Sequence, residues 1–523
     1  MQEELTILYT SDVHGHVMPL NYGTNETEEV GLVKYATVVK QARKTRRNLL
    51  VLDNGDLIQG TPLMTNYVKN FSHEENPMIG IMNRLQIDAG VLGNHEFNFG
   101  KKIIKDAVEQ ADYPILSANI LNQDTKTPAF GPPYVIKQLP GGFKVAIIGV
   151  TTHYIPNWES PAHIAGLEFE DAFKSLEKWT AYVLANESPD VVIASYHGGF
   201  EKDLETGEPT ENLTGENQGY EMCKQIEGID ILLTGHQHRL ITGYVDDVLV
   251  VQPGKNAAHY AEITVTLEKT DDGSWKITRK EAELHDFQKI ENDTEILQYI
   301  TPLEKATQEW LDQPVGYIKG DMTIDDPFQA RIKKHPFIQL IQDVQMDASG
   351  ADISVTSLLN DSSTGFSEVV TMRDIVSNYM YPNTLVVLEL TGKDIKAALE
   401  QTANYFILDE RGEIAVNPTY IEPKPQHYNY DMWEGIDYTL NISKPAGERV
   451  ENITYKGEPL QDEKTYHVVL NNYRATGGGD YNMFPGKKVV KEIQKDAVEL
   501  IHAYFEEHDT VEAYVINNFH VTT

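Results

Sequence analysis

The sequence predicts an α/β protein built from two domains, and three observations support this prediction. The chain has 523 residues, which is more than a single hydrophobic core usually serves. Short apolar runs rich in Val, Ile and Leu each stop at a cluster of polar residues, which is typical of buried strands. Helical patterns lie between several of these runs, so strands and helices alternate as they do in layered α/β domains.

The apolar runs of the first domain predict its strands. They cover residues 5–10, 48–53, 88–93, 144–150, 190–196 and 229–234. Amphipathic patterns over residues 29–46 and 169–187 predict helices that pack against these strands. In open α/β sheets, binding sites form beyond the strand ends, where loops converge. The polar residues that follow each run are therefore the first candidates for function.

A change of pattern marks the end of the first domain. A polar, hairpin-like stretch at residues 268–288 is followed by a helical pattern at residues 292–312 and then by Pro-marked sequence. We expect the boundary near residue 325, which gives domains of residues 1–325 and 326–523. The second part again mixes helical and strand patterns, and it predicts another α/β or α+β domain.

The composition argues against polyanionic partners. The chain carries 44 Lys and Arg residues against 79 Asp and Glu residues, a formal net charge of −35. Such a chain repels DNA, RNA and anionic membranes, so we expect neither a nucleic-acid polymer nor a membrane as a partner. A small anionic substrate would need a local cation, most simply a bound metal, to attract it.

The single cysteine, Cys223, excludes an internal disulfide and is best interpreted as a small buried residue of a helix. No run of about 18 apolar residues occurs, and the first residues lack a signal-peptide pattern. We therefore expect a cytoplasmic protein. The alternative is a secreted or cell-wall-associated protein whose leader has been removed. We expect a monomer, with a dimer as the alternative.

Polar side chains that bind metals gather directly after the predicted strands. They are Asp12, His14, Asp56, Asn94, His95, His197, His236 and His238. Residues i and i+2 of an extended chain face the same side, so Asp12 and His14 can point together, and His236 and His238 likewise, if the local backbone stays extended. Imidazole and carboxylate without thiolate suit divalent Mn, Fe, Zn, Co or Ni. So many ligands exceed the needs of one ion and predict two ions that share a carboxylate.

Each motif alone has a simpler interpretation. An Asp-x-His sequence is usually a turn, and a histidine after a strand is more often hydrogen-bonded than metal-bound. The sequence "GNHE" is also compatible with a left-handed turn at a helix start. Because unrelated accidents would not all fall at strand ends, the joint occurrence favours a metal site.

These motifs together resemble a known family. The sequences "DVH", "GD", "GNHE", "YHGG" and "GHQH" match the D-x-H, G-D, G-N-H-E, H and G-H-x-H signature of the calcineurin-like metallophosphoesterases. The chain is more similar still to the bacterial two-domain 5'-nucleotidases and 2',3'-cyclic-nucleotide phosphodiesterases. This resemblance implies an N-terminal β-sandwich flanked by helices, which carries the metals, and a C-terminal α/β domain that binds the nucleotide.

The resemblance also implies roles for the motif residues. One ion would be held by Asp12, His14, Asp56 and His238, and the other by Asp56, Asn94, His197 and His236. Asp56 would bridge the two ions, and His95 would lie beside the scissile phosphate, which a metal-activated hydroxide attacks. Gln59 is a weaker candidate for an outer contact.

One departure from the family bears on the substrate. Many 5'-nucleotidases have "NHEFD", whereas this chain has "NHEFNFG", with Asn98 as the partner of the catalytic His95. An amide can orient an imidazole but cannot stabilise its full positive charge. The Asn form resembles the 2',3'-cyclic phosphodiesterase/3'-nucleotidase branch, which we therefore expect. The alternatives are a broad-specificity 5'-nucleotidase and, from another class, a catalytically dead nucleotide-binding protein.

The second domain resembles the same branch. "YMYPNTLVVLELT" and "LNNYRATGGGDYNMF" match its segments, and two aromatic rings that sandwich the base would be Tyr381 and Tyr473. Asp480 and Asn472 are candidates for hydrogen bonds to the base or ribose. Stacking accepts any base, so we expect broad base tolerance. The stretch "DISVTSLLNDSSTGFSE" lacks the Arg or Lys that relatives place near the substrate phosphate, and Asn360 is a weak candidate to replace it.

Overall fold

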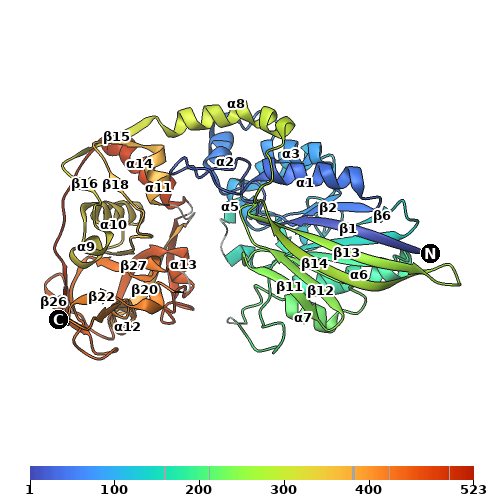
Figure 1. Cartoon of the computed structure of the whole chain (residues 1–523). Helices are drawn as coiled ribbons and strands as arrows, with labels where there is room; N and C mark the ends of the chain where they lie inside the picture. The colour runs from blue at the N-terminus through green and yellow to red at the C-terminus, as the bar shows by residue number, and fades with distance from the viewer. Residues whose placement is uncertain (158, 160, 211–212, 380–382, 423–424, 494) are drawn as a thin grey trace. The chain divides into compact units, whose positions relative to one another are not determined.

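The computed structural model describes residues 1–157, 159, 161–210, 213–379, 383–422, 425–493 and 495–523. The chain forms two compact units (Figure 1). Unit 1 contains Met1–Asn21 and Asn25–Thr307, and unit 2 contains Tyr22–Thr24 and Gln308–Thr523. The division falls inside helix α8 (Thr294–Leu311). The sequence pattern instead changes after this helix ends, so the sequence predicts the domain boundary near residue 325.

Unit 1 contains two six-stranded sheets in the orders β14-β13-β1-β2-β3-β4 and β11-β12-β10-β9-β7-β6. The first consists of β1 (Gln2–Thr10), β2 (Leu49–Asp53), β3 (Ala89–Val91), β4 (Ile115–Leu116), β13 (His259–Lys269) and β14 (Trp275–Asp286). The second consists of β6 (Tyr134–Gln138), β7 (Lys144–Thr151), β9 (Val191–His197), β10 (Ile231–Thr234), β11 (Leu240–Val245) and β12 (Val248–Pro253). Strands β1 to β4 are parallel, as are β7, β9, β10 and β12.

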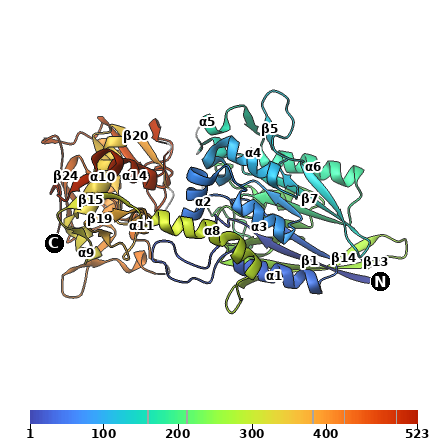
Figure 2. The same cartoon turned by 90° about the horizontal axis from the view of Figure 1, so that it is seen from above.

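The two sheets of unit 1 pack face to face and form a β-sandwich. Their shared core contains Ile7, Leu50 and Leu52 of the first sheet and Ile193 and Leu233 of the second, all at most 1% exposed. Alternate residues of β9 and β10 face a second core beneath helices α6 (Ala172–Asn186) and α7 (Gly219–Gln225). Figure 2 shows α1 and α6 on opposite sides of unit 1, with strands of both sheets between them. The predicted fold class is confirmed.

The α-helices that lie wholly in unit 1 are α1 (Leu32–Thr45), α2 (Pro62–Asn66), α3 (Pro77–Leu85), α4 (Gly100–Gln110), α5 (Pro161–Ile164), α6 (Ala172–Asn186) and α7 (Gly219–Gln225). Among them, α1, α6 and α7 pack against strands of the sandwich. Helix α6 begins where the Asp171 carboxylate accepts a hydrogen bond from the Lys174 amide at 3.0 Å, the usual N-cap arrangement. No helix in the described part of the chain is both long enough and apolar enough to span a membrane.

Unit 2 is an α/β domain around the five-stranded sheet β23-β17-β27-β20-β28. These strands are β17 (Ile353–Thr356), β20 (Leu385–Thr391), β23 (Met432–Glu434), β27 (Thr465–Asn471) and β28 (Lys488–Ile493). The main helices are α9 (Pro327–Lys333), α10 (Pro336–Ser349), α11 (Met372–Asn378), α12 (Gly392–Ala403), α13 (Asn472–Ala475) and α14 (Ala497–His508). A four-stranded sheet contains β24 (Ile436–Asn441), β25 (Val450–Tyr455), β26 (Glu458–Pro459) and β30 (Phe519–Thr522).

A buried ion pair joins two segments of unit 2. Arg474, at the end of α13, is 1% exposed and meets the Asp431 carboxylate through Nε at 2.8 Å and Nη2 at 3.0 Å. The same guanidinium donates to the carbonyl oxygens of Tyr428, at 2.8 Å, and of Gly478. Arg474 thereby fixes the loop that follows α13.

Replacing Asp431 by Asn should destabilise unit 2, because it leaves the Arg474 charge buried and unpaired. We expect the free energy of unfolding to fall by about 3–5 kcal/mol. Urea unfolding followed by fluorescence measures the change. The matched control, Asp462→Asn, changes an exposed carboxylate and should stay within about 0.5 kcal/mol of the wild type. Equal stability of the two variants would contradict a structural role for the pair.

Candidate metal centre

The loops after β1, β2, β3, β9 and β10 bring the motif residues of unit 1 together. The loop after β1 lies along the loop after β2, because the amides of Asp12 and His14 donate to the carbonyls of Gly55 and Asp56 at 2.9 and 2.8 Å. The sandwich places the ends of β9 and β10 beside them, and Asn54 Nδ2 donates to the carbonyl of Tyr196 at 3.0 Å. Side chains far apart in the sequence therefore meet at one edge of the fold.

Five of the motif residues have left-handed backbone conformations. Asp12, His14, Asp56, His236 and His238 have φ values of +54°, +51°, +52°, +66° and +58°. The extended backbone on which the expected pairing depends is therefore not present at these residues. Asp, Asn and His tolerate this region better than other non-glycine residues, and the interloop hydrogen bonds hold the loops in it. Asp12 and His14 belong to the same cluster although their backbone is left-handed, whereas His236 and His238 belong to different clusters.

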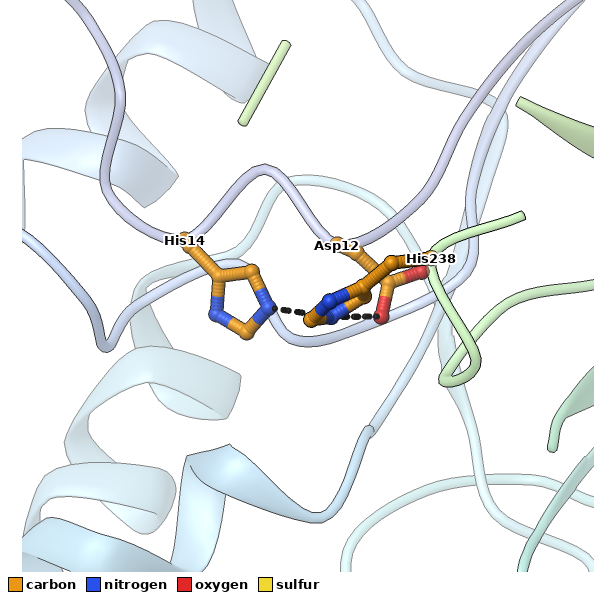
Figure 3. Close-up of side chains that lie close together, drawn as sticks. All are labelled: Asp12, His14 and His238. Carbon is orange, nitrogen blue, oxygen red and sulfur yellow. Dashed lines mark hydrogen bonds and ion pairs between the residues drawn. The ribbon is translucent and has the colours of Figure 1, made fainter. Parts of the chain in front are cut away.

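The first cluster is formed by Asp12, His14 and His238 (Figure 3). His14 Nε2 lies 3.1 Å from His238 Nε2, and His238 Nε2 lies 3.4 Å from Asp12 Oδ1. Asp12 is fully buried and His14 is 7% exposed, whereas the His238 side chain is 32% exposed, so the cluster is buried on one side and reaches solvent at His238.

The second cluster is formed by Asp56, His197 and His236. His197 Nε2 lies 3.3 Å from Asp56 Oδ2. The amide oxygen of Asn94 completes the group, because it lies 3.1 Å from His197 Nε2 and 2.9 Å from His236 Nδ1.

The Asp56 carboxylate connects the two clusters. Its Oδ2 lies 3.3 Å from His197 Nε2 and 3.9 Å from His14 Nε2, one histidine from each cluster. This oxygen is buried, and no described residue gives it a hydrogen bond of normal geometry. A buried anionic oxygen between two sets of imidazoles fits a carboxylate that bridges two cations.

Charges in the site follow from burial and from these contacts. Burial opposes ionisation of Asp56, but the neighbouring His197, His95 and His14 outweigh it and hold the pKa of Asp56 well below its usual value. Burial lowers the pKa of His14 to about 3, so this imidazole is neutral, as a metal ligand must be. Burial also disfavours the charged form of His197, but Asp56 raises the pKa of His197 to about 10. Cation binding there must displace a proton.

Three of the four clustered histidines are oriented through their second ring nitrogen. His14 Nδ1 contacts the carbonyl of Gln59 at 3.0 Å, and His197 Nδ1 contacts the carbonyl of Asn54 at 2.6 Å. His236 Nε2 contacts Glu216 Oε1 at 2.8 Å. Such outer partners fix the tautomer of a ligand and raise its basicity. Gln59 thus contributes a backbone oxygen, and Glu216 is a functional candidate that the sequence did not reveal.

Two glycines of the motifs allow the loops to approach closely. A Cβ atom at Gly93 would collide with the Asp56 carboxylate, and one at Gly235 would lie 2.5 Å from Asp12 Oδ2. At Gly93 of "GNHE" and Gly235 of "GHQH", a neighbouring carboxylate occupies the space that a Cβ atom would need, so glycine is required there.

His95 lies beside the clusters and has its own partners. Its ring centroid lies 5.3 Å from that of His14, and its amide donates to Asp56 Oδ1 at 2.8 Å. Its Nδ1 contacts Asn98 Oδ1 at 2.7 Å, the contact expected of an orienting residue. Asn98 Nδ2 in turn donates to Glu159 Oε2 at 2.8 Å. No sequence motif pointed to Glu159.

Three of the candidates of unit 2 lie close together in the sequence, in α13 and in the loop that follows it. Asn472 and Tyr473 belong to α13, and Asp480 ends the glycine run that follows. Tyr473 is 41% exposed, and its ring stands at 76° to that of Tyr428, 6.1 Å away. The Asn472 Oδ1 atom is buried without a partner among the described residues, and Asp480 is exposed. Tyr381 lies outside the described residues.

Two family models match the chain. Residues 5–240 match the calcineurin-like phosphoesterase family, and residues 314–486 match the 5'-nucleotidase C-terminal domain. A solved structure from Staphylococcus aureus, named as a candidate 5'-nucleotidase and bound to alpha-ketoglutarate, is 35% identical. The match extends over 100% of this chain and 100% of that chain, with a TM-score of 0.81.

Curated relatives carry related names. The 2',3'-cyclic-nucleotide 2'-phosphodiesterase/3'-nucleotidase of Haemophilus influenzae is 29% identical over 92% of this chain and 81% of its own. The trifunctional nucleotide phosphoesterase protein YfkN of Bacillus subtilis is 27% identical over 99% of this chain, which spans 39% of that protein's length.

The chain is thus similar to these proteins over both units, with the metal-binding motifs of the first domain brought together in space. It belongs to the family in which a calcineurin-like phosphoesterase domain precedes a 5'-nucleotidase C-terminal domain, and it is a metal-dependent phosphoric ester hydrolase.

Proposed function

We propose that the protein is a dimetal phosphoesterase that hydrolyses nucleoside 2',3'-cyclic phosphates and then 3'-nucleotides. The observation that carries the dimetal part is the position of the Asp56 carboxylate between two imidazole clusters. The observation that favours the cyclic substrate is the contact of the Asn98 amide with His95, at a position where the resemblance implies a carboxylate in many 5'-nucleotidases.

The residues present fit two divalent ions. Asp12, His14, Asp56 and His238 would hold one, and Asp56, Asn94, His197 and His236 would hold the other. Nitrogen and carboxylate donors suit Mn, Zn, Fe, Co or Ni. When bound, two such ions lower the pKa of a shared water and clamp the phosphate oxygens.

The protein's own groups supply orientation and hydrogen bonds. Asn98 holds the His95 ring through Nδ1, which leaves Nε2 for the substrate. When both ring nitrogens carry a hydrogen, His95 donates from Nδ1 to Asn98 and from Nε2 to the phosphate or to the leaving oxygen. A direct attack by water needs no covalent enzyme intermediate, so no nucleophilic Ser or Cys is required.

The leaving group distinguishes the two enzyme candidates. Because Asn98 carries no charge, it supports a protonated His95 less than a carboxylate would. A strained cyclic diester needs less help from an acid than a 5'-monoester does. Relatives at 27–29% identity are named 2',3'-cyclic-nucleotide 2'-phosphodiesterase/3'-nucleotidase, which supports the same branch. The match to the 5'-nucleotidase C-terminal domain supports a broad 5'-nucleotidase as the second candidate.

A substrate panel tests the proposal. The manganese-loaded protein is given bis-p-nitrophenyl phosphate, 2',3'-cyclic AMP, 3'-AMP and 5'-AMP, and kcat/KM is measured for each. We expect the cyclic nucleotide to be the best nucleotide substrate. A higher value for 5'-AMP would indicate the 5'-nucleotidase instead. Tight nucleotide binding without turnover of any ester would indicate a catalytically dead binding protein.

Glu216→Gln should weaken one of the two metal positions. The carboxylate orients His236 through Nε2, and loss of such an outer partner lowers metal affinity by about 10–100-fold. Titration of the metal-free protein with zinc against a chromophoric chelator should show one weakened and one unchanged ion. The control Glu205→Gln alters an exposed residue of the same connecting segment. Equal losses in both variants would exclude an effect through His236.

Tyr473→Ala should remove a stacking surface for the base. Base–aromatic stacking contributes about 1–3 kcal/mol, so kcat/KM for nucleotides should fall about ten-fold or more, while p-nitrophenyl esters keep their rate. The control Tyr317→Ala removes another exposed tyrosine of unit 2, 43% exposed on β15 (Pro314–Lys319). An equal loss on both kinds of ester would show that the Tyr473 ring is structural.

A further inference from the structure

A chain of hydrogen bonds runs outward from His95 through three further residues. His95 Nδ1 lies 2.7 Å from Asn98 Oδ1, and Asn98 Nδ2 donates to Glu159 Oε2 at 2.8 Å. The other oxygen of the carboxylate, Glu159 Oε1, lies 2.8 Å from His163 Nδ1. Glu159 follows a short 3-10 turn (Ile155–Asn157), and His163 belongs to α5, so neither comes from a motif loop.

The carboxylate at the outer part of this chain sets its direction. An ionised carboxylate accepts hydrogen bonds and cannot donate them, whereas an amide can do either, depending on which way it is turned. Glu159 therefore requires that Asn98 turn its NH2 group outward. The Asn98 oxygen then faces His95, so Nδ1 of His95 must carry a hydrogen, both in the neutral ring and in the ring that also donates from Nε2.

Glu159 is itself held in place. Its side chain is 6% exposed, whereas that of His163 is 33% exposed. The Glu159 amide donates to the carbonyl of Ile155 at 3.0 Å, which fixes the backbone beneath the carboxylate. One carboxylate oxygen contacts His163, so the other remains directed at Asn98. Asn98 is exposed and would otherwise be free to reverse its amide.

We propose that Glu159 is a positioning residue for the phosphoesterase reaction. It fixes the orientation of the Asn98 amide and, through it, the ring of His95, with Nε2 left for the substrate. The inference rests on the proposed function, because it assigns a purpose to the orientation of His95. It also explains how the neutral Asn98 can orient His95. The carboxylate of Glu159 does not contact the imidazole directly but acts on it through the Asn98 amide.

A double-mutant cycle tests the inference. In the wild-type background, Glu159→Gln replaces a pure acceptor by a group that can donate or accept, so the Asn98 amide is no longer held in one direction. We expect kcat for 2',3'-cyclic AMP to fall about ten-fold, within the contribution of a positioned acid, with KM unchanged. Bis-p-nitrophenyl phosphate, whose leaving group is good, should lose less.

The Asn98→Asp background should reverse the sign of the effect. There two carboxylates face each other where the amide now donates, and like charges at this distance repel. Glu159→Gln then supplies a hydrogen-bond donor to the introduced carboxylate and removes the repulsion, so the double variant should be more active than Asn98→Asp alone. A role confined to stability would lower activity in both backgrounds, and an equal fold-change in both would overturn the inference.

Controls separate this result from misfolding and from failure of the proposed function. Each variant should keep two metal ions per chain and the wild-type melting temperature, and Glu187→Gln, which alters a partner of Tyr134 outside this chain of hydrogen bonds, should keep wild-type kcat. If the wild type turns over no phosphate ester, the proposed function fails. NMR of ¹⁵N-histidine in the zinc-loaded protein still decides the inference. Nδ1 of His95 should carry a hydrogen in the wild type and only part of the time in Glu159→Gln, and identical His95 signals in both would overturn the inference.

Discussion

The candidate metal centre depends on the buried carboxylate of Glu96, because this group joins two of its loops by hydrogen bonds. The carboxylate accepts hydrogen bonds from the amides of Asp56, at 2.8 Å, Leu57, at 2.6 Å, and Gly93, at 2.5 Å, and thereby ties the loop after β2 to the loop after β3. Glu96 is 4% exposed, and burial raises its pKa. Since Asp56 lies in one of the joined loops and Asn94 in the other, the Glu96 carboxylate helps to hold these two candidate ligands in place.

Burial divides the acidic groups of the site into two kinds. The carboxylates of Asp12 and Asp56 meet imidazoles, and their pKa values are lowered although both are fully enclosed. Asp53 accepts hydrogen bonds from Thr10 and from the Gly55 amide, yet burial raises its pKa to about 8. Negative charge is thus concentrated on the oxygens that face the two clusters. In a chain with a net charge of −35, such local arrangement matters more to an anionic substrate than the total does.

Much of the fold could be predicted from the sequence because the signals are local. The apolar run at residues 190–196 is strand β9, and the pattern at residues 169–187 is helix α6. The signature motifs indicated which side chains would meet. The sequence could not predict the left-handed backbone of the motif loops, because that conformation depends on hydrogen bonds between loops. Nor could it find Glu216 or Glu159, since each lies in a segment without a motif and reaches its partner only through the tertiary fold.

The left-handed backbone of Asp12, His14, Asp56, His236 and His238 has a consequence for the evolution of the family. At these positions a side chain must meet two requirements: it must supply a donor atom, and it must tolerate left-handed backbone. A lineage that abandoned hydrolysis would still be under pressure to place Asn or Gly there, and would reject Val or Ile. Conservation of polar residues at these five positions is therefore weaker evidence of catalysis than conservation of Asn94 or His197, because the backbone of Asn94 and His197 is not left-handed.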